Sequence, residues 1–241
     1  AVAVAGTLIG YAIAGGTIGG LVRGYAGFGF AMSAVPIMSM GISPAIVVPS
    51  VLIHELAIGM FSLKSEKGSA DPSLLIWLCL GSLIGTPLGL LALSHVSDDS
   101  MRLAIALVLL LSVIALWTSR RNFITLQASV LSAAGFVSGI LNGASAMSGP
   151  PVIITLLGSN LSASKMRGIS IYFIAFSAAI GVGLSLVIGT QTITGLFIAF
   201  FMLPGVLLGV LAGVFAFQKL PRKHYRSIAL AGLFTLSVVS L

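Results

Sequence analysis

The feature that most constrains this chain is the length of its stretches without a charged residue. The longest stretch runs from Gly168 to Gln218, and another runs from Asn122 to Ser164. A helix needs about 20 apolar residues to cross about 30 Å of hydrocarbon, so each stretch accommodates two crossings. Only 7% of the residues are charged and 58% are hydrophobic, whereas a soluble domain has about a quarter charged. This composition excludes a soluble globular protein and predicts a multi-pass membrane protein.

The spanning segments are predicted to be helices. No part of the chain alternates apolar and polar residues with a period of two, as the strands of a membrane barrel would. The 241 residues accommodate roughly eight to ten helical segments and almost no aqueous domain. The predicted fold class is therefore an all-α polytopic membrane protein.

One sequence pattern occurs twice, and every residue of the second copy follows its counterpart by the same interval. The first copy consists of Gly20, Val22, Gly24, Ala31, Met32, Ser33 and Pro36. The second copy consists of Gly135, Val137, Gly139, Ala146, Met147, Ser148 and Pro151. An internal repeat of this kind indicates two homologous halves, which we place at residues 1–119 and 120–241. Both are expected to belong to one integral membrane domain.

Each half is predicted to contain a broken-helix hairpin followed by three spans. The breaks are expected in glycine-rich segments, at residues 23–30 and 141–146, with a shorter helix after each. The further spans are predicted at residues 44–63, 73–94 and 101–117 in the first half, and at 166–188, 193–217 and 225–241 in the second. A hairpin plus three crossings is an odd number of passages, so the second half is expected to lie upside down relative to the first.

The basic residues indicate the orientation of the chain. Most of the 12 Lys and Arg residues lie in short loops between apolar spans, and such residues are retained on the cytoplasmic side. These residues are Lys64, Lys67, Arg120, Arg121, Lys165, Arg167, Lys219, Arg222, Lys223 and Arg226. Because the loop positions explain the net charge of +7, we do not expect nucleic acid as a partner. The lipid bilayer is the expected surrounding.

Motifs for enzymatic chemistry are not found in the sequence. There is no P-loop, no H-E-x-x-H motif, no nucleophile elbow and no pair of carboxylates within a span. Cys79 is the single cysteine, which excludes an intrachain disulfide and a Cys-rich metal site. The chain is therefore predicted not to be an enzyme and to need neither metal nor cofactor. Without an ATP-binding motif, any transport is expected to be driven by an ion or substrate gradient.

Two segments resemble a known family. They run from Gly24-Tyr25-Ala26-Gly27-Phe28-Gly29-Phe30 to Pro36, and from Gly139-Ile140-Leu141-Asn142-Gly143 to Gly149-Pro150-Pro151. Together with the length and the two-half layout, they are similar to the TauE/SafE sulfite exporter family. This resemblance implies a secondary transporter that moves sulfite, thiosulfate, sulfonates or similar small anions across a cytoplasmic membrane, here expected to be a bacterial inner membrane.

The candidate substrate site lies where the two hairpins meet. Inverted repeats place a substrate near the bilayer midplane, where discontinuous helices end, and helix N-termini bind anions through unpaired N–H groups. Helix starts are expected near residues 29–33 and 145–148. The candidate site residues are Arg23, Gly27, Phe28, Gly29, Ser33, Asn142, Gly143, Ser145 and Ser148. The alternative is that these glycines and serines only allow close packing of helices.

Three ionisable residues are candidates for function inside the membrane. Arg23 is expected either to attract the anion or to anchor the first helix at the cytoplasmic face. His54 and Glu55 lie in an otherwise apolar span, and an intramembrane ionisable pair can relay protons. Adjacent helical residues point about 100° apart, so one of the two is expected to face the cavity. The alternative for this pair is a structural hydrogen bond between helices.

The predicted function is export of a small sulfur-containing anion by alternating access, with protons as a candidate coupling ion. Uptake of the same anions and a passive anion channel remain alternatives, as does a non-transporting scaffold. Small residues such as Gly181 and Gly183 allow close helix contacts within one chain or between protomers. The sequence therefore also leaves a homo-oligomer open.

Overall fold

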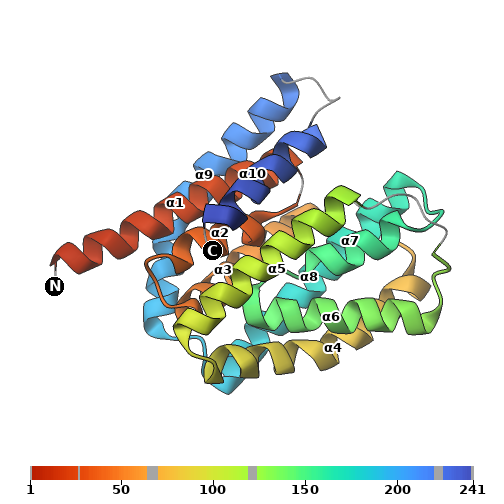
Figure 1. Cartoon of the computed structure of the whole chain (residues 1–241), viewed down its shortest axis with the longest axis horizontal. Helices are drawn as coiled ribbons and strands as arrows, with labels where there is room; N and C mark the ends of the chain where they lie inside the picture. The colour runs from red at the N-terminus through yellow and green to blue at the C-terminus, as the bar shows by residue number, and fades with distance from the viewer. Residues whose placement is uncertain (1, 27, 64–69, 119–123, 220–224, 240–241) are drawn as a thin grey trace.

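The computed structural model describes residues 2–26, 28–63, 70–118, 124–219 and 225–239. Every regular element in these residues is an α-helix (Figure 1). In chain order the helices are α1 (Val2–Ala26), α2 (Phe30–Ser39), α3 (Pro44–Leu63), α4 (Pro72–His95), α5 (Asp98–Thr118), α6 (Ala128–Ser145), α7 (Gly149–Leu157), α8 (Ala163–Ile188), α9 (Ile193–Lys219) and α10 (Tyr225–Val239). The six segments predicted as spans outside the hairpins are helices α3, α4, α5, α8, α9 and α10, with small differences at their ends.

The outer surface of the helices is apolar. Six helices in the described residues are long and apolar enough to cross a membrane, namely α3, α4, α5, α6, α8 and α9. Large side chains stand on their outer faces, among them Ile84, Phe200 and Leu211, each more than 60% exposed. Contact of such a surface with water is unfavourable, whereas its contact with apolar lipid chains is not. The chain is a multi-pass membrane protein.

Both helix breaks are shorter than the sequence predicts, and the second lies later in the chain. Helix α1 continues to Ala26, so Arg23 and Gly24 are helical, and α2 begins at Phe30. Helix α6 continues through Asn142 and Gly143 to Ser145, and α7 begins at Gly149. The predicted second break at residues 141–146 is therefore wrong, and the observed break lies at residues 146–148. Glycine in a helix costs only about 1 kcal/mol, and the helix contacts described next compensate for that cost.

Two pairs of helices pack with their backbones almost in contact. Helix α1 lies against α9, and α4 lies against α6 along the lower edge of the view in Figure 1. A Cβ atom placed on Gly20 would lie 2.6 Å from the carbonyl oxygen of Val206, and one on Gly139 would lie 2.6 Å from that of Ser82. Real Cβ contacts are not that short. The same holds for the neighbouring glycines Gly16, Gly24, Gly205, Gly209 and Gly213, and for Gly81, Gly85, Gly89, Gly135 and Gly143. Small residues at every fourth position drive such packing in membranes, where helices gain no hydrophobic energy from association.

The short helices α2 and α7 turn back along the helices that precede them. Gly41, after α2, lies against the ring of Tyr11, and Gly15 lies against Met38, so α1 and α2 are antiparallel. In the second half the N–H of Ile124 donates to the carbonyl oxygen of Gly158 at 2.7 Å, which joins the segment before α6 to the end of α7. Each pair therefore forms a hairpin whose helix break lies inside the protein.

Helix α2 lies at the centre of the molecule. All ten of its residues are buried, and its large side chains Phe30 and Met38 are 0% exposed. The surrounding hydrophobic core contains residues of both halves, for example Leu52 of α3, Met147 of the second break and Met202 of α9. The two halves therefore share one core rather than forming separate globular units.

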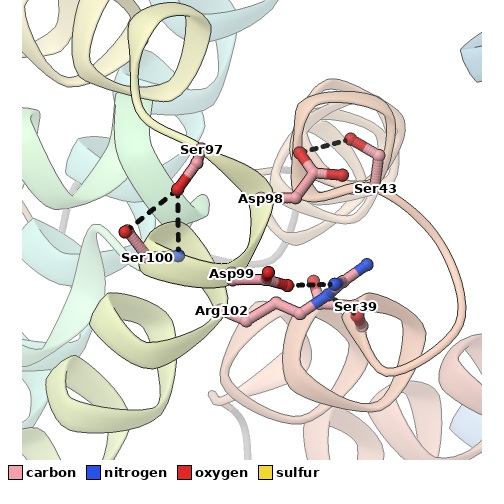
Figure 2. Close-up of polar contacts among 7 residues, drawn as sticks. All are labelled: Ser39, Ser43, Ser97, Asp98, Asp99, Ser100 and Arg102. Carbon is pink, nitrogen blue, oxygen red and sulfur yellow. Dashed lines mark hydrogen bonds and ion pairs between the residues drawn. The ribbon is translucent and has the colours of Figure 1, made fainter.

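The C-terminal end of α2 is held by α5. The Nε of Arg102 donates to the carbonyl oxygen of Ser39 at 2.6 Å, and its Nη1 forms an ion pair with Asp99 at 3.0 Å (Figure 2). Close by, the hydroxyl of Ser43 donates to Asp98 at 2.9 Å. A cation at a helix C-terminus is favourable because the last carbonyls are unpaired and carry partial negative charge. These contacts join the turn between α2 and α3 to the start of α5.

Replacing Arg102 by Met is expected to lower the free energy of unfolding by about 1 to 2 kcal/mol. The loss comes from the charged hydrogen bond to Ser39, since the pair with the exposed Asp99 contributes little. The measurement is the unfolding midpoint of the purified protein in detergent. Lys165→Met, at an exposed residue of α8, serves as the matched control and is expected to leave the midpoint unchanged. Equal midpoints for the two variants would show that Arg102 does not hold α2.

Candidate functional site

A small cavity lies between the two helix breaks. From the first half it is lined by Arg23, Phe28, Gly29, Ala31, Met32 and Glu55. From the second half it is lined by Ala146, Met147, Ser148, Gly149, Pro150, Ile153 and Ile174. Its volume is about 20 Å³, which is room for about one water molecule. The cavity therefore joins the broken helices of the two halves.

The first break presents backbone donors to this cavity. Gly29 precedes α2 with a φ of 87°, a left-handed conformation that glycine adopts without strain. The hydrogen-bond ladder of α2 starts with the N–H of Ser33, which donates to the carbonyl oxygen of Gly29 at 3.2 Å. The N–H groups of Phe30, Ala31 and Met32 therefore point out of the helix end, where a helix N-terminus favours negative charge.

The second break offers fewer donors. Helix α6 ends with Ala146 in the left-handed region, at a φ of 58°, and Ser148 stands immediately before α7. The first turn of α7 contains Pro150 and Pro151, and proline has no N–H group. The two half-sites are therefore unequal, because α2 supplies a full turn of backbone donors and α7 lacks two of them.

Two charged side chains line the cavity, one of each sign. Arg23 is 7% exposed and Glu55 is 6% exposed. Oε1 of Glu55 accepts a hydrogen bond from the N–H of Ala31 at 3.2 Å, so the carboxylate lies on the N-terminal end of α2. Its other oxygen, Oε2, is buried and has no hydrogen-bond partner among the described residues. Arg23 is close enough to interact electrostatically with Glu55.

The structure brings together some of the predicted site residues. Arg23, Phe28, Gly29, Ser148 and Glu55 line the cavity. Gly27 lies outside the described residues. So do Lys64, Lys67, Arg120, Arg121, Arg222 and Lys223 of the predicted cytoplasmic loops, and the side chain of Arg226.

The other predicted site residues lie away from the cavity lining. The hydroxyl of Ser33 donates to Gly29 O at 2.7 Å, and that of Ser145 donates to Leu141 O at 2.8 Å. The side-chain amide of Asn142 donates to Ser177 O on α8 at 2.8 Å. Gly143 faces α4, where a Cβ atom would collide with the carbonyl oxygen of Thr86. Gly143 therefore allows close packing of α6 against α4, which is the alternative to a role in substrate binding.

His54 and Glu55 point in different directions. Glu55 lines the cavity, whereas Nδ1 of His54 lies 3.2 Å from the carbonyl oxygen of Ser50 and its ring packs against Phe30, with centroids 6.0 Å apart. This separation follows from the 100° step between adjacent helical residues. The described residues contain no group of three or more His, Cys, Asp or Glu side chains placed to hold a metal ion.

Several cavity residues were not selected from the sequence. The cavity lining contains two pairs of equivalent residues from the repeated pattern, namely Ala31 with Ala146 and Met32 with Met147. The repeat was therefore a signal that could have identified them. Ile174 reaches the cavity from α8, and no local sequence feature distinguishes it from other apolar residues of that span.

Comparison with known proteins gives a family match and no individual relative. Residues 12–240 match the model of a family described as Sulfite exporter TauE/SafE. No curated protein and no solved structure matches the chain. The family match covers nearly the whole chain, including both hairpins and every residue that lines the cavity. The chain therefore belongs to the TauE/SafE sulfite exporter family, a family of membrane transporters.

Proposed function

We propose that this protein is a secondary transporter that exports sulfite, a sulfonate or a related small sulfur-containing anion, and that the anion binds in the cavity between the two helix breaks. The observation that carries the proposal is the cavity itself. It combines the N-terminal end of α2 with the buried cation Arg23. A helix N-terminus and a guanidinium group together match an oxyanion in charge and in hydrogen bonding.

We also propose that the two halves are inverted repeats, divided at residues 119 and 120. Helices α3 and α8 occupy corresponding places in the two halves. Gly59 of α3 lies against Ala175 of α8, while Gly181 of α8 lies against Leu52 of α3. The two helices are thus antiparallel, which is the arrangement that inversion requires. Inverted repeats commonly alternate access to a site at their interface.

The size of the cavity supports alternating access rather than an open channel. A volume of about 20 Å³ accommodates about one water molecule and is too small for an anion with several heavy atoms. The site must therefore widen before the anion enters, and the hairpins are the segments whose movement would widen it. The membrane in which the transporter operates is proposed to be the bacterial inner membrane, with the basic loops on the cytoplasmic side.

Counterflow in proteoliposomes tests the proposed function. Vesicles containing the purified protein are loaded with unlabelled sulfite and diluted into labelled sulfite. A carrier is expected to accumulate label transiently, and the accumulation should saturate and compete with thiosulfate or sulfoacetate but not with chloride. Large, non-saturating flux would support a channel. An absence of counterflow, together with an unfolding midpoint that none of these anions raises, would overturn the proposal.

A further inference from the structure

Glu55 occupies the position that an anion would take at the end of α2. Its Oε1 accepts the N–H of Ala31 at 3.2 Å, while Oε2 is buried without a hydrogen-bond partner among the described residues. We propose that the anion binds only when Glu55 is protonated, so that Glu55 takes up one proton with each anion and the carboxyl O–H at Oε2 donates to the bound anion. This inference rests on the proposed function and adds the identity of the coupling group and the number of protons.

The charges of the cavity support this assignment. Arg23 and Glu55 are the charged side chains in its lining, so the empty cavity is electrically balanced when both are ionised. A bound monovalent anion would leave one uncompensated negative charge in a buried space, which is strongly unfavourable. Protonation of Glu55 restores the balance, since the anion then faces Arg23 and a neutral carboxyl group. The proton comes from water, and no bond of the anion changes.

The other ionisable groups on the helices around Glu55, among them Tyr25 of α1 and Tyr172 of α8, do not line the cavity. On α3 itself, His54 points toward Ser50 and Phe30 and does not line the cavity. On α8, Lys165 and Arg167 lie about two turns or more from Ile174, the residue of that helix that lines the cavity. Helix α2 contains no charged residue, and α9 has only Lys219, at its end. Arg23 is therefore the charged side chain that shares the cavity with Glu55.

The test measures binding of methanesulfonate, a monovalent sulfonate, to the purified full chain between pH 5 and pH 8, a range in which methanesulfonate itself does not titrate. For the wild-type protein, the Kd is expected to rise up to tenfold per pH unit, because one proton is linked to binding. Titration calorimetry at pH 7 in two buffers of different ionisation enthalpy is expected to show uptake of about one proton per anion. Glu55→Gln is expected to bind methanesulfonate with a nearly constant Kd over this range and with no proton uptake.

Two further variants complete the test. His54→Gln changes the adjacent ionisable residue and is expected to keep the pH dependence, and Glu55→Asp is expected to keep it as well. If Glu55→Gln retained the wild-type pH dependence, or if wild-type binding took up no proton, the inference would be overturned while the proposed function stood. If the wild-type protein bound no methanesulfonate at any pH, the inference would be overturned, whereas the proposed function is overturned only by the combined counterflow and stability result described above. If Glu55→Gln does not fold, the proton count on the wild-type protein still tests the uptake of one proton, and loss of that uptake in His54→Gln would overturn the assignment to Glu55.

Discussion

Gly139→Ala is expected to lower the free energy of unfolding by about 2 to 3 kcal/mol, and Gly139→Leu to prevent accumulation of folded protein. A Cβ atom at this position would lie 2.6 Å from the carbonyl oxygen of Ser82 and 2.9 Å from the amide nitrogen of Thr86. Both atoms belong to the backbone of α4, which cannot rotate away as a side chain could. Overpacking of a core typically costs about 1 to 3 kcal/mol, and the rigidity of two helices places this case at the upper end.

Gly183 provides the matched control for this prediction. It also lies inside a long helix, α8, but no atom is found within 4 Å of a Cβ built on it. Gly183→Ala is therefore expected to leave the protein as stable as the wild type or to stabilise it slightly, because alanine favours a helix by about 1 kcal/mol over glycine. The unfolding midpoint and the yield of monodisperse protein in detergent are the measurements. A similar loss in both variants would mean that the α4–α6 contact is not what stabilises the fold.

Arg23→Gln is expected to weaken sulfite binding about 100-fold while the protein remains folded. The guanidinium group of Arg23 is buried in the cavity lining and supplies the positive charge that faces the anion. Loss of a buried charge partner costs about 2 to 5 kcal/mol, and 100-fold corresponds to about 2.7 kcal/mol. The folded state is expected to survive because Glu55, left without its countercharge, can take up a proton.

Calorimetric titration with sulfite and the counterflow assay measure this effect. Arg23→Lys retains the charge but loses the planar, bidentate donors, so an intermediate loss of about tenfold is expected. Lys219→Gln removes a cation at the end of α9, where the ammonium group lies 4.7 Å from the centre of the Phe215 ring, and should leave affinity unchanged. Wild-type affinity in Arg23→Gln would show that the anion binds elsewhere.

The repeated sequence pattern proved to contain two kinds of residue. Its glycines, such as Gly20 and Gly139, bring the backbones of α1 and α9 and of α4 and α6 together. Its Ala-Met-Ser segments lie at the helix breaks, where Met32 and Met147 line one cavity. Of this pattern, only Ser33 and Ser148 were predicted to belong to the anion site. Gly143, just after the second copy's glycines, was also predicted there but packs against Thr86, because a glycine that permits helix packing and one that permits ligand approach cannot be told apart in the sequence.

The unequal first turns of α2 and α7 were visible in the sequence. Pro150 and Pro151 remove two N–H groups from the start of α7, whereas the first turn of α2 contains no proline. The sequence does not show what this difference affects. In the structure both helix starts face one cavity, so the difference makes the two half-sites unequal in backbone donors. The contact between Glu55 and the N–H of Ala31 joins residues of different helices, and no local pattern predicts it.

The sequence by itself determined that the chain is a helical membrane protein, where most of its helices lie and that its family is TauE/SafE. These properties depend on hydropathy and on local patterns, which are fixed by residues close together in the chain. Only the tertiary structure decided that α6 passes through Gly143, that Asn142 binds α8 and that Glu55 lies on the end of α2. Each of these features depends on the backbone of another helix. The spacing of residues within one helix carries no information about the distance between two helices.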